Sequence, residues 1–188
     1  MTTEAVQGSP RRAELLASAY SYALGNGLSD MSLRPLAQAT GTSPRVLLYL
    51  FGSKDDLIAE ILAKARTEQL HLVTTVLSEH RHSGNAFDAL VDRLWNWLAE
   101  PAQRDTIRLF FEAYTRSLKN ESGPWREFAA QSVRDWIELL DSAQPEVDRA
   151  AATLRSTRAL ALLRGLLLDL LACEDLDRVN SAIFPIPD

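Results

Sequence analysis

The sequence predicts an all-α protein. Apolar residues recur at helical spacing through most of the chain, and no stretch alternates between apolar and polar residues as a half-buried strand would. Glycine and proline number only 8 each, and most of them separate the periodic stretches. Because 46% of the residues are apolar, the chain can build a core. We therefore expect about nine helices, arranged as a three-helix head and a C-terminal helical bundle.

The clearest local pattern lies in residues 32–57. Ser32 is placed to cap one short helix, and Gly41 is placed to end it in a left-handed conformation. Ser43 and Pro44 then predict the start of a second short helix. Its inward face is expected to consist of Val46, Leu47 and Leu50. Two short helices joined by a glycine-containing turn are typical of a helix-turn-helix, whose second helix enters the major groove of DNA.

The flanking segments are also expected to be helical. Ser9 and Pro10 predict a first helix, and Ser53 with Asp56 predicts the capped start of a long helix over residues 54–80. Further helices are expected to start at Pro124 and Pro145 and, for a short last one, near Asp177. The expected domains are a helix-turn-helix DNA-binding domain at 1–53 and a ligand-binding and dimerisation domain at 54–188, linked by the helix at 54–80.

The head resembles the DNA-binding domain of the TetR family of transcriptional regulators. The resemblance is carried by the spacing of Gly41, Phe51, Lys54 and Leu57 and covers under a third of the chain. The later helices match that family only in number and rough length. The resemblance implies a homodimeric regulator, most simply a repressor, that binds a palindromic operator in double-stranded DNA. A small apolar or aromatic effector in the C-terminal domain would release it by changing the spacing of the two heads.

Eight residues are candidates for DNA contact. Arg45 and Tyr49 lie four apart on the second short helix and are expected to face the groove, since arginine is the commonest reader of guanine. Two alternatives stay open, because Tyr49 could pack over the head's core and Lys54 could be a solvated charge. Leu48 and Leu50 stand where the family usually has an aromatic residue or histidine, and we expect both to pack into the core. The full candidate set is Ser32, Arg34, Thr42, Ser43, Pro44, Arg45, Tyr49 and Lys54.

The charge distribution permits DNA binding but does not demand it. The net charge is −5, yet residues 1–66 carry seven basic and six acidic residues, against 13 and 19 in the remainder. A head this weakly basic needs a few well-placed phosphate contacts, doubled by dimerisation. The alternative function is a small-molecule-binding helical protein whose head has a weakened or lost affinity for DNA.

Aromatic and apolar residues of the C-terminal half suggest a ligand pocket and a dimer interface. Arg164 and Asp169 lie within an apolar helix, so each needs a partner on a neighbouring helix, on the twin subunit or on a ligand. The candidate pocket residues are Trp95, Phe110, Phe111, Tyr114, Trp136, Arg164 and Asp169. Because the last long helix is apolar nearly all round, a second copy is expected to cover one side of it. The candidate interface residues are Trp125, Phe128, Val133, Ile137, Leu160, Leu163, Leu167 and Leu171.

Other classes of function find little support in the sequence. The lone Cys173 lies in an apolar run and is expected to be a small buried hydrophobe. His71, His80 and His82 lack the arrangement of a metal site, and no nucleophile motif or phosphate-binding loop is present. The longest apolar run is too short and too charged to span a bilayer, and no apolar leader opens the chain. We therefore expect a cytoplasmic protein that is not an enzyme, with no cofactor, metal or membrane partner.

Overall fold

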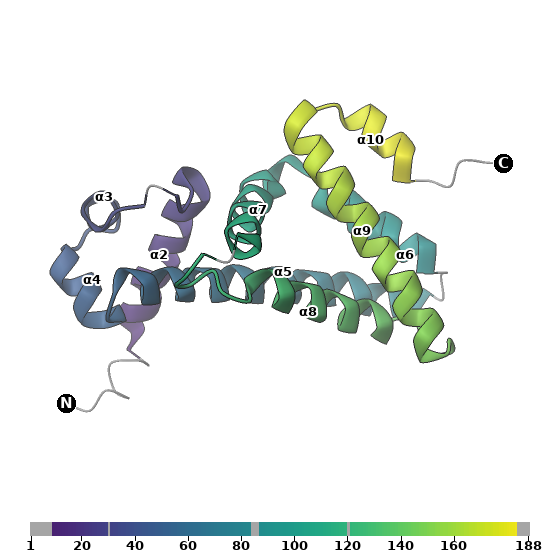
Figure 1. Ribbon diagram of the computed structural model, residues 1–188, viewed down its shortest axis with the longest axis horizontal. Coiled ribbons are helices and arrows are strands. Elements are labelled where there is room, and N and C mark those ends of the chain that lie inside the picture. Colours follow the sequence, from purple (N-terminus) through teal and green to yellow (C-terminus); the bar gives the residue numbers. More distant parts are fainter. Residues whose placement is uncertain (1–8, 30, 84–86, 120, 184–188) are drawn as a thin grey trace. The chain divides into compact units, whose positions relative to one another are not determined.

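The computed structural model describes residues 9–29, 31–83, 87–119 and 121–183, and within these ranges the chain forms helices and no strand (Figure 1). The all-α prediction is therefore confirmed. Contacts divide the chain into two compact units, the first of Met1–Thr67 and Arg108–Ala129 and the second of Glu68–Ile107 and Ala130–Asp188. The boundaries of these units differ from those of the functional domains expected at 1–53 and 54–188.

The described residues form nine α helices and one short 3-10 helix. In chain order these are α2 (Pro10–Asn26), α3 (Leu33–Ala39), α4 (Pro44–Phe51), α5 (Lys54–Ser83), α6 (Phe87–Leu98), η1 (Pro101–Gln103), α7 (Arg104–Leu118), α8 (Phe128–Ser142), α9 (Arg149–Cys173) and α10 (Leu176–Ile183). The helix α5 is 30 residues long and continues past the predicted end at residue 80.

Most of the predicted helix ends of the head are confirmed. The Ser43 hydroxyl accepts a hydrogen bond of 3.3 Å from the Val46 N–H, and Pro44 takes the first position of α4. Gly41 follows α3 with a φ of 64°, a conformation that costs glycine little. Ser53 and Asp56 exchange side-chain to backbone hydrogen bonds of 3.0 Å at the start of α5. Ser32 precedes α3, but its hydroxyl makes no capping hydrogen bond, so that part of the prediction is wrong.

The core of the first unit is shared by the head and a later segment of the chain. Its buried side chains from α2 to α5 include Leu15, Ala19, Tyr20, Ala23, Leu36, Leu47, Phe51, Leu57 and Ile61. Leu109 and Ala113 of α7 and Trp125 of the following turn are buried in the same cluster. The helix-turn-helix therefore rests on a core that residues after 107 complete.

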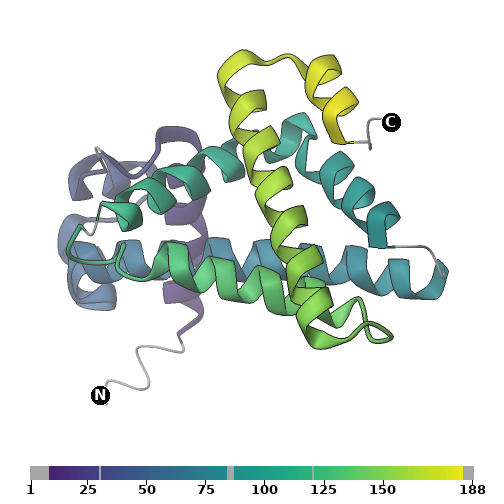
Figure 2. The ribbon, with the colours of Figure 1, turned by 45° about the vertical axis from the view of Figure 1, so that its right-hand side comes forward.

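The second unit is built around α6, α9 and α10 (Figure 2). Every apolar residue of the predicted α6 stripe is buried, and α9 buries Leu160, Leu163, Leu167 and Leu170 against the same unit. The chain turns after α9, and Asn180 of α10 accepts a hydrogen bond of 2.7 Å from the Trp95 indole on α6. The expectation that Cys173 is buried is wrong, because its side chain is exposed at the end of α9.

Two predicted helix starts are wrong by four residues. Residues after Pro124 form turns, and α8 begins at Phe128, directly after Glu127 with its φ of 63°. Likewise, α9 begins at Arg149. Asp148 caps this helix, because its carboxylate accepts hydrogen bonds from the N–H groups of Ala150 and Ala151. At α9 the aspartate, rather than the proline, therefore sets the first turn of the helix.

Within the described ranges, no helix has the length and apolar character needed to cross a membrane. The same ranges contain no cluster of three or more histidine, cysteine, aspartate or glutamate side chains that could hold a metal ion. The side chains of His80 and His82 lie outside the described residues.

Candidate nucleic-acid interface and ligand pocket

The helix α4 presents a distinct outer face. Leu47 and Phe51, four residues apart, bury the inner face, whereas Arg45, Leu48 and Tyr49 are exposed. Residues at i, i+3 and i+4 share one side of a helix, so these three side chains point outward together. Tyr49 is 67% exposed, which excludes the alternative that its ring packs over the head's core.

Two apolar residues of α4 are not where the sequence placed them. Val46 and Leu48 were expected to face inward, but they are 38% and 41% exposed. They flank Leu47 in sequence and are therefore turned about 100° to either side of it. A helix of eight residues buries only a narrow stripe, and Leu50 is only partly buried at its edge. Leu48 thus belongs to the outer face with Arg45 and Tyr49.

Arg12 of α2 fixes the end of α4. Its Nε donates a hydrogen bond of 3.1 Å to the Leu50 carbonyl, and its guanidinium lies 4.9 Å from the centre of the Phe51 ring. The same guanidinium forms an ion pair with Glu60 of α5. This partly buried arginine therefore connects three helices of the head. Sequence patterns miss it, because its three partners lie 38 to 48 residues away.

The other candidate DNA-contacting residues are accessible. Ser32, Arg34, Ser43 and Lys54 are exposed, and Thr42 and Pro44 are partly exposed. All of them lie in the first unit, on α3 or α4, at the ends of these helices or, for Lys54, at the start of α5. Contact with DNA remains a prediction for each.

A carboxylate on α7 holds the chain that leads into the helix-turn-helix. Glu112 accepts hydrogen bonds of 3.1 and 2.9 Å from the Leu28 N–H and a further one from the Ser29 hydroxyl. Gly27, with a φ of 74°, allows the carboxylate to approach, since a Cβ there would lie 3.0 Å from it.

Arg116 of α7 connects that helix to the turn that follows it. Its guanidinium pairs with Glu121 at 3.2 Å and lies 4.6 Å from the centre of the Trp125 ring.

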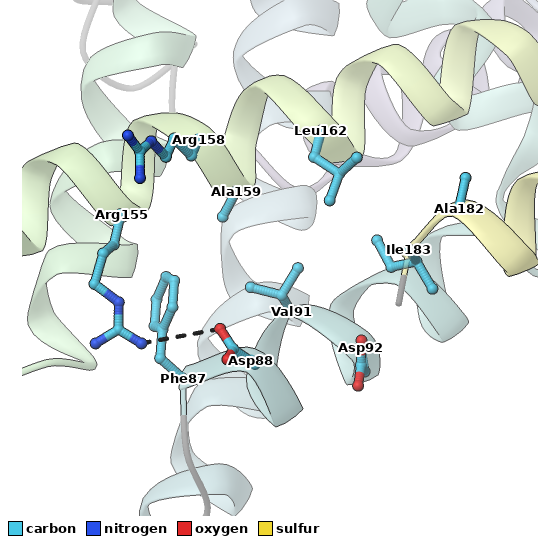
Figure 3. A pocket seen from close by; sticks show the side chains of 10 residues that line it. All are labelled: Phe87, Asp88, Val91, Asp92, Arg155, Arg158, Ala159, Leu162, Ala182 and Ile183. Carbon is cyan, nitrogen blue, oxygen red and sulfur yellow. Dashed lines mark ion pairs between the residues drawn. The ribbon is translucent and has the colours of Figure 1, made fainter. Parts of the chain in front are cut away.

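The second unit contains a pocket of about 530 Å³ (Figure 3). Its walls come from one face each of α6 and α9 and from the end of α10. The lining residues are Phe87, Asp88, Val91, Asp92, Arg155, Arg158, Ala159, Leu162, Ala182 and Ile183. Its volume lies within the range typical of small-molecule sites.

Charged groups of both signs line this pocket. Arg155 lies 3.9 Å from the Asp88 carboxylate and 5.0 Å from the centre of the Phe87 ring (Figure 3). Asp92 follows Asp88 by one helical turn and has no ion-pair or hydrogen-bond partner within the described part of the chain. Burial, with a smaller contribution from the Asp88 carboxylate, raises the pKa of Asp92 above its ordinary value of 3.8.

None of the residues predicted for a ligand site lines this pocket. Trp95 and Trp136 are buried core residues, 1% and 4% exposed. Phe110, Phe111 and Tyr114 are half-buried and form a ring cluster in the first unit, with centroids 5.2 and 5.5 Å apart. The sequence pattern indicates aromatic residues but not whether they line a cavity or fill a core.

The two charges inside the apolar helix have partners on neighbouring helices. Arg164 donates a hydrogen bond of 2.9 Å to the Ser132 hydroxyl of α8. Asp169 accepts one of 2.9 Å from Arg178 of α10. The sequence left open a partner on a neighbouring helix, on a second subunit or on a ligand. In the structure, both charges have a partner on a neighbouring helix.

Half of the predicted interface residues cannot form a contact surface. Leu160, Leu163 and Leu167 of α9 and Trp125 are already buried within the chain. Phe128, Val133, Ile137 and Leu171 are partly buried and remain candidates. The large apolar side chains that α9 exposes are Leu154, Leu162 and Leu168. The prediction chose leucines that face the unit's own core. In a helix that is apolar on all sides, the sequence does not indicate which side faces inward.

Comparison with known proteins places the fold in a class. No protein-family model matches the sequence, and no curated protein does either. Solved structures of bacterial transcriptional regulators do match: one from Rhodococcus sp. Rha1 has a TM-score of 0.73 at 20% identity, covering 92% of this chain and 91% of that one. The described helices thus have the fold of transcriptional regulators.

Two further matches define that fold more closely. A TetR-family regulator from Cytophaga hutchinsonii matches with a TM-score of 0.73 at 15% identity, covering 92% of this chain and 90% of that one. The multidrug-binding protein EbrR, complexed with proflavin, matches with a TM-score of 0.66 at 21% identity, covering 92% and 97%. The chain therefore has the TetR-like fold that the resemblance of its head predicted.

Proposed function

We propose that this protein is a cytoplasmic, ligand-responsive transcriptional regulator that binds a palindromic DNA operator as a homodimer and is released by a small-molecule effector. The observation that carries the proposal is the outer face of α4, where Arg45, Leu48 and Tyr49 are exposed beside a capped helix-turn-helix turn. The Ser43 cap of α4 and the Arg12 contacts favour this function over a head that has lost its affinity for DNA.

Arg45 is proposed to read a base and Lys54 to contact a phosphate. Both side chains are exposed, and both lie at the start of a helix of the head. A guanidinium can donate two hydrogen bonds to guanine O6 and N7, whereas an ammonium provides a point charge. The two heads would read half-sites one helical turn, about 34–36 Å, apart.

Dimerisation is proposed to use the exposed apolar side of α9. Leu154 and Leu168, which lie outside the pocket, would be removed from water by a second copy, which stabilises the assembly in proportion to the apolar area buried. An effector would then act by favouring a head spacing that does not fit two half-sites. The pocket of the second unit supports the effector role, as does the proflavin complex of EbrR.

Selection of bound sequences from random DNA tests the proposal. The full-length protein is expected to enrich a palindrome, and Arg45→Ala is expected to lose about 1–3 kcal/mol of specific binding and to relax one base position per half-site. Affinity should also fall steeply with salt as counterions are released. Recovery of random sequences by the native protein, together with a flat salt response, would reject DNA binding.

A further inference from the structure

We propose that the pocket between α6, α9 and α10 binds an apolar molecule carrying a protonated amine, with the amine against Asp92 and the apolar body on Val91, Leu162 and Ile183 (Figure 3). The proposal names the chemical class of the effector and in that respect rests on the proposed function. Binding itself requires only the second unit's own residues.

The apolar part of the assignment follows from the pocket walls. Val91, Ala159 and Ile183 are buried and form a floor without hydrogen-bonding side chains. Leu162 is 38% exposed at the wall, so a bound apolar body would remove more of its surface from water. The volume of about 530 Å³ accommodates a molecule of several rings or a ring with an alkyl chain.

The charge of the ligand follows from which pocket groups already have partners. Arg155 is held by the Asp88 carboxylate at 3.9 Å and by the Phe87 ring at 5.0 Å. Asp92 has no such partner in the described chain, and it stands one turn from the like charge of Asp88. A cation beside Asp92 would provide the missing counter-charge and relieve that repulsion. Burial, and to a smaller extent the Asp88 carboxylate, raise the pKa of Asp92, and a bound cation would oppose that shift.

An organic anion fits the same walls less well. To reach a guanidinium closely it would have to draw Arg155 away from both Asp88 and Phe87, and it would then lie near two carboxylates. Arg158 is exposed, and Figure 3 shows it on the Arg155 side of the pocket, away from Asp92. Water therefore screens Arg158, and it does not oppose a cation bound at the far end.

Three compounds with one shared body test the charge. Calorimetric titration of the full-length protein with 4-phenylbutylamine, 4-phenylbutyrate and 4-phenylbutan-1-ol is expected to rank the amine first, by about tenfold or more over both others. Asp92→Asn, which keeps the size of the side chain, should remove that preference and leave the alcohol unchanged. Asp177→Asn, on the exposed face of α10 and outside the pocket, is the matched control and should behave as the native protein.

Equal affinity for the amine and the alcohol, stronger binding of the carboxylate, or amine binding that survives Asp92→Asn would each overturn the assignment. The ranking of the three compounds uses the native protein, so it holds even if a variant folds poorly. DNA binding is scored in a separate titration with the selected operator. An amine that binds through Asp92 without changing operator affinity would support the pocket and count against the proposed regulation.

Discussion

The Nε atom of Arg12 donates a hydrogen bond of 3.1 Å to the backbone carbonyl of Leu50, in the last turn of α4. Carbonyl groups in the last turn of a helix have no donor within that helix, and a cation there also complements the helix dipole. Because Arg12 pairs with Glu60 as well, one side chain connects the end of α4 to both α2 and α5.

Replacing Arg12 should therefore weaken the head without removing a DNA contact. Arg12→Met is expected to lower the free energy of unfolding by about 1.5–3 kcal/mol, since Glu60 and the Leu50 carbonyl lose a charged donor. Urea unfolding measures the change. Arg11→Met is the control: Arg11 is exposed and, among the described residues, pairs only with Glu14 of its own helix, so the effect should stay within about 0.5 kcal/mol. Equal stability of both variants would show that the Arg12 contacts contribute nothing.

Leu48 is expected to read thymine. An exposed leucine on the outer face of α4 cannot donate a hydrogen bond, but its methyl groups can contact the thymine C5-methyl. Replacing the contacted thymine by deoxyuridine should weaken binding of the native protein by about 1 kcal/mol, close to the transfer value of one methyl group. With Leu48→Ala the same replacement should have no effect. Gel-shift titrations of the four combinations measure the coupling, and additive losses would contradict a direct contact.

Freeing Asp88 should strengthen amine binding. In Arg155→Gln, the Asp88 carboxylate loses its partner and the Phe87 ring loses the cation beside it. A second carboxylate and an aromatic face then become available to 4-phenylbutylamine, which should gain about 0.5–2 kcal/mol in affinity. The neutral alcohol should gain far less, and Arg158→Gln, a change of equal charge on the same helix, serves as the control. Weaker amine binding by Arg155→Gln would show that Arg155 helps to hold the ligand.

The affinity for the amine should rise with pH. The pKa of Asp92 is raised in the free protein, and a bound cation would lower it, so binding expels a proton wherever Asp92 is still protonated. Affinity should therefore increase with pH until Asp92 is ionised in the free protein and stay constant beyond, while the amine remains protonated. The other charged groups lining the pocket are Asp88 on α6 and Arg155 and Arg158 on α9; α10 contributes none.

Calorimetry across that pH range measures this dependence. With Asp92→Asn the affinity should not change with pH, because asparagine has no carboxyl proton to release on binding. A slope that persists in the variant would assign the titration to Asp88 instead.

Short-range patterns were enough to predict the turn between α3 and α4. Ser43, Pro44 and Gly41 act on neighbours within four residues, so their roles could be inferred before any packing was known. The apolar stripe of α6 was also predicted in full, because its polar residues leave one consistent face.

Long-range contacts could not be predicted in the same way. Arg12 meets Leu50 and Glu60 only after three helices have packed, and no spacing in the sequence indicates that meeting. The pocket was missed for a related reason: its walls are ordinary helix faces with one phenylalanine, whereas the tryptophans that suggested a site are buried. In α9, leucines on all sides hid which ones face the unit's own core.

The shared core of the first unit has a consequence for how the protein is made. Leu109, Ala113 and Trp125 are buried among the side chains of α2 to α5, yet they are synthesised long after α5 begins. A nascent chain that ends at residue 67 exposes the apolar surface those residues cover. The helix-turn-helix can therefore reach its final stability only once Trp125 has left the ribosome, although its own sequence was translated first.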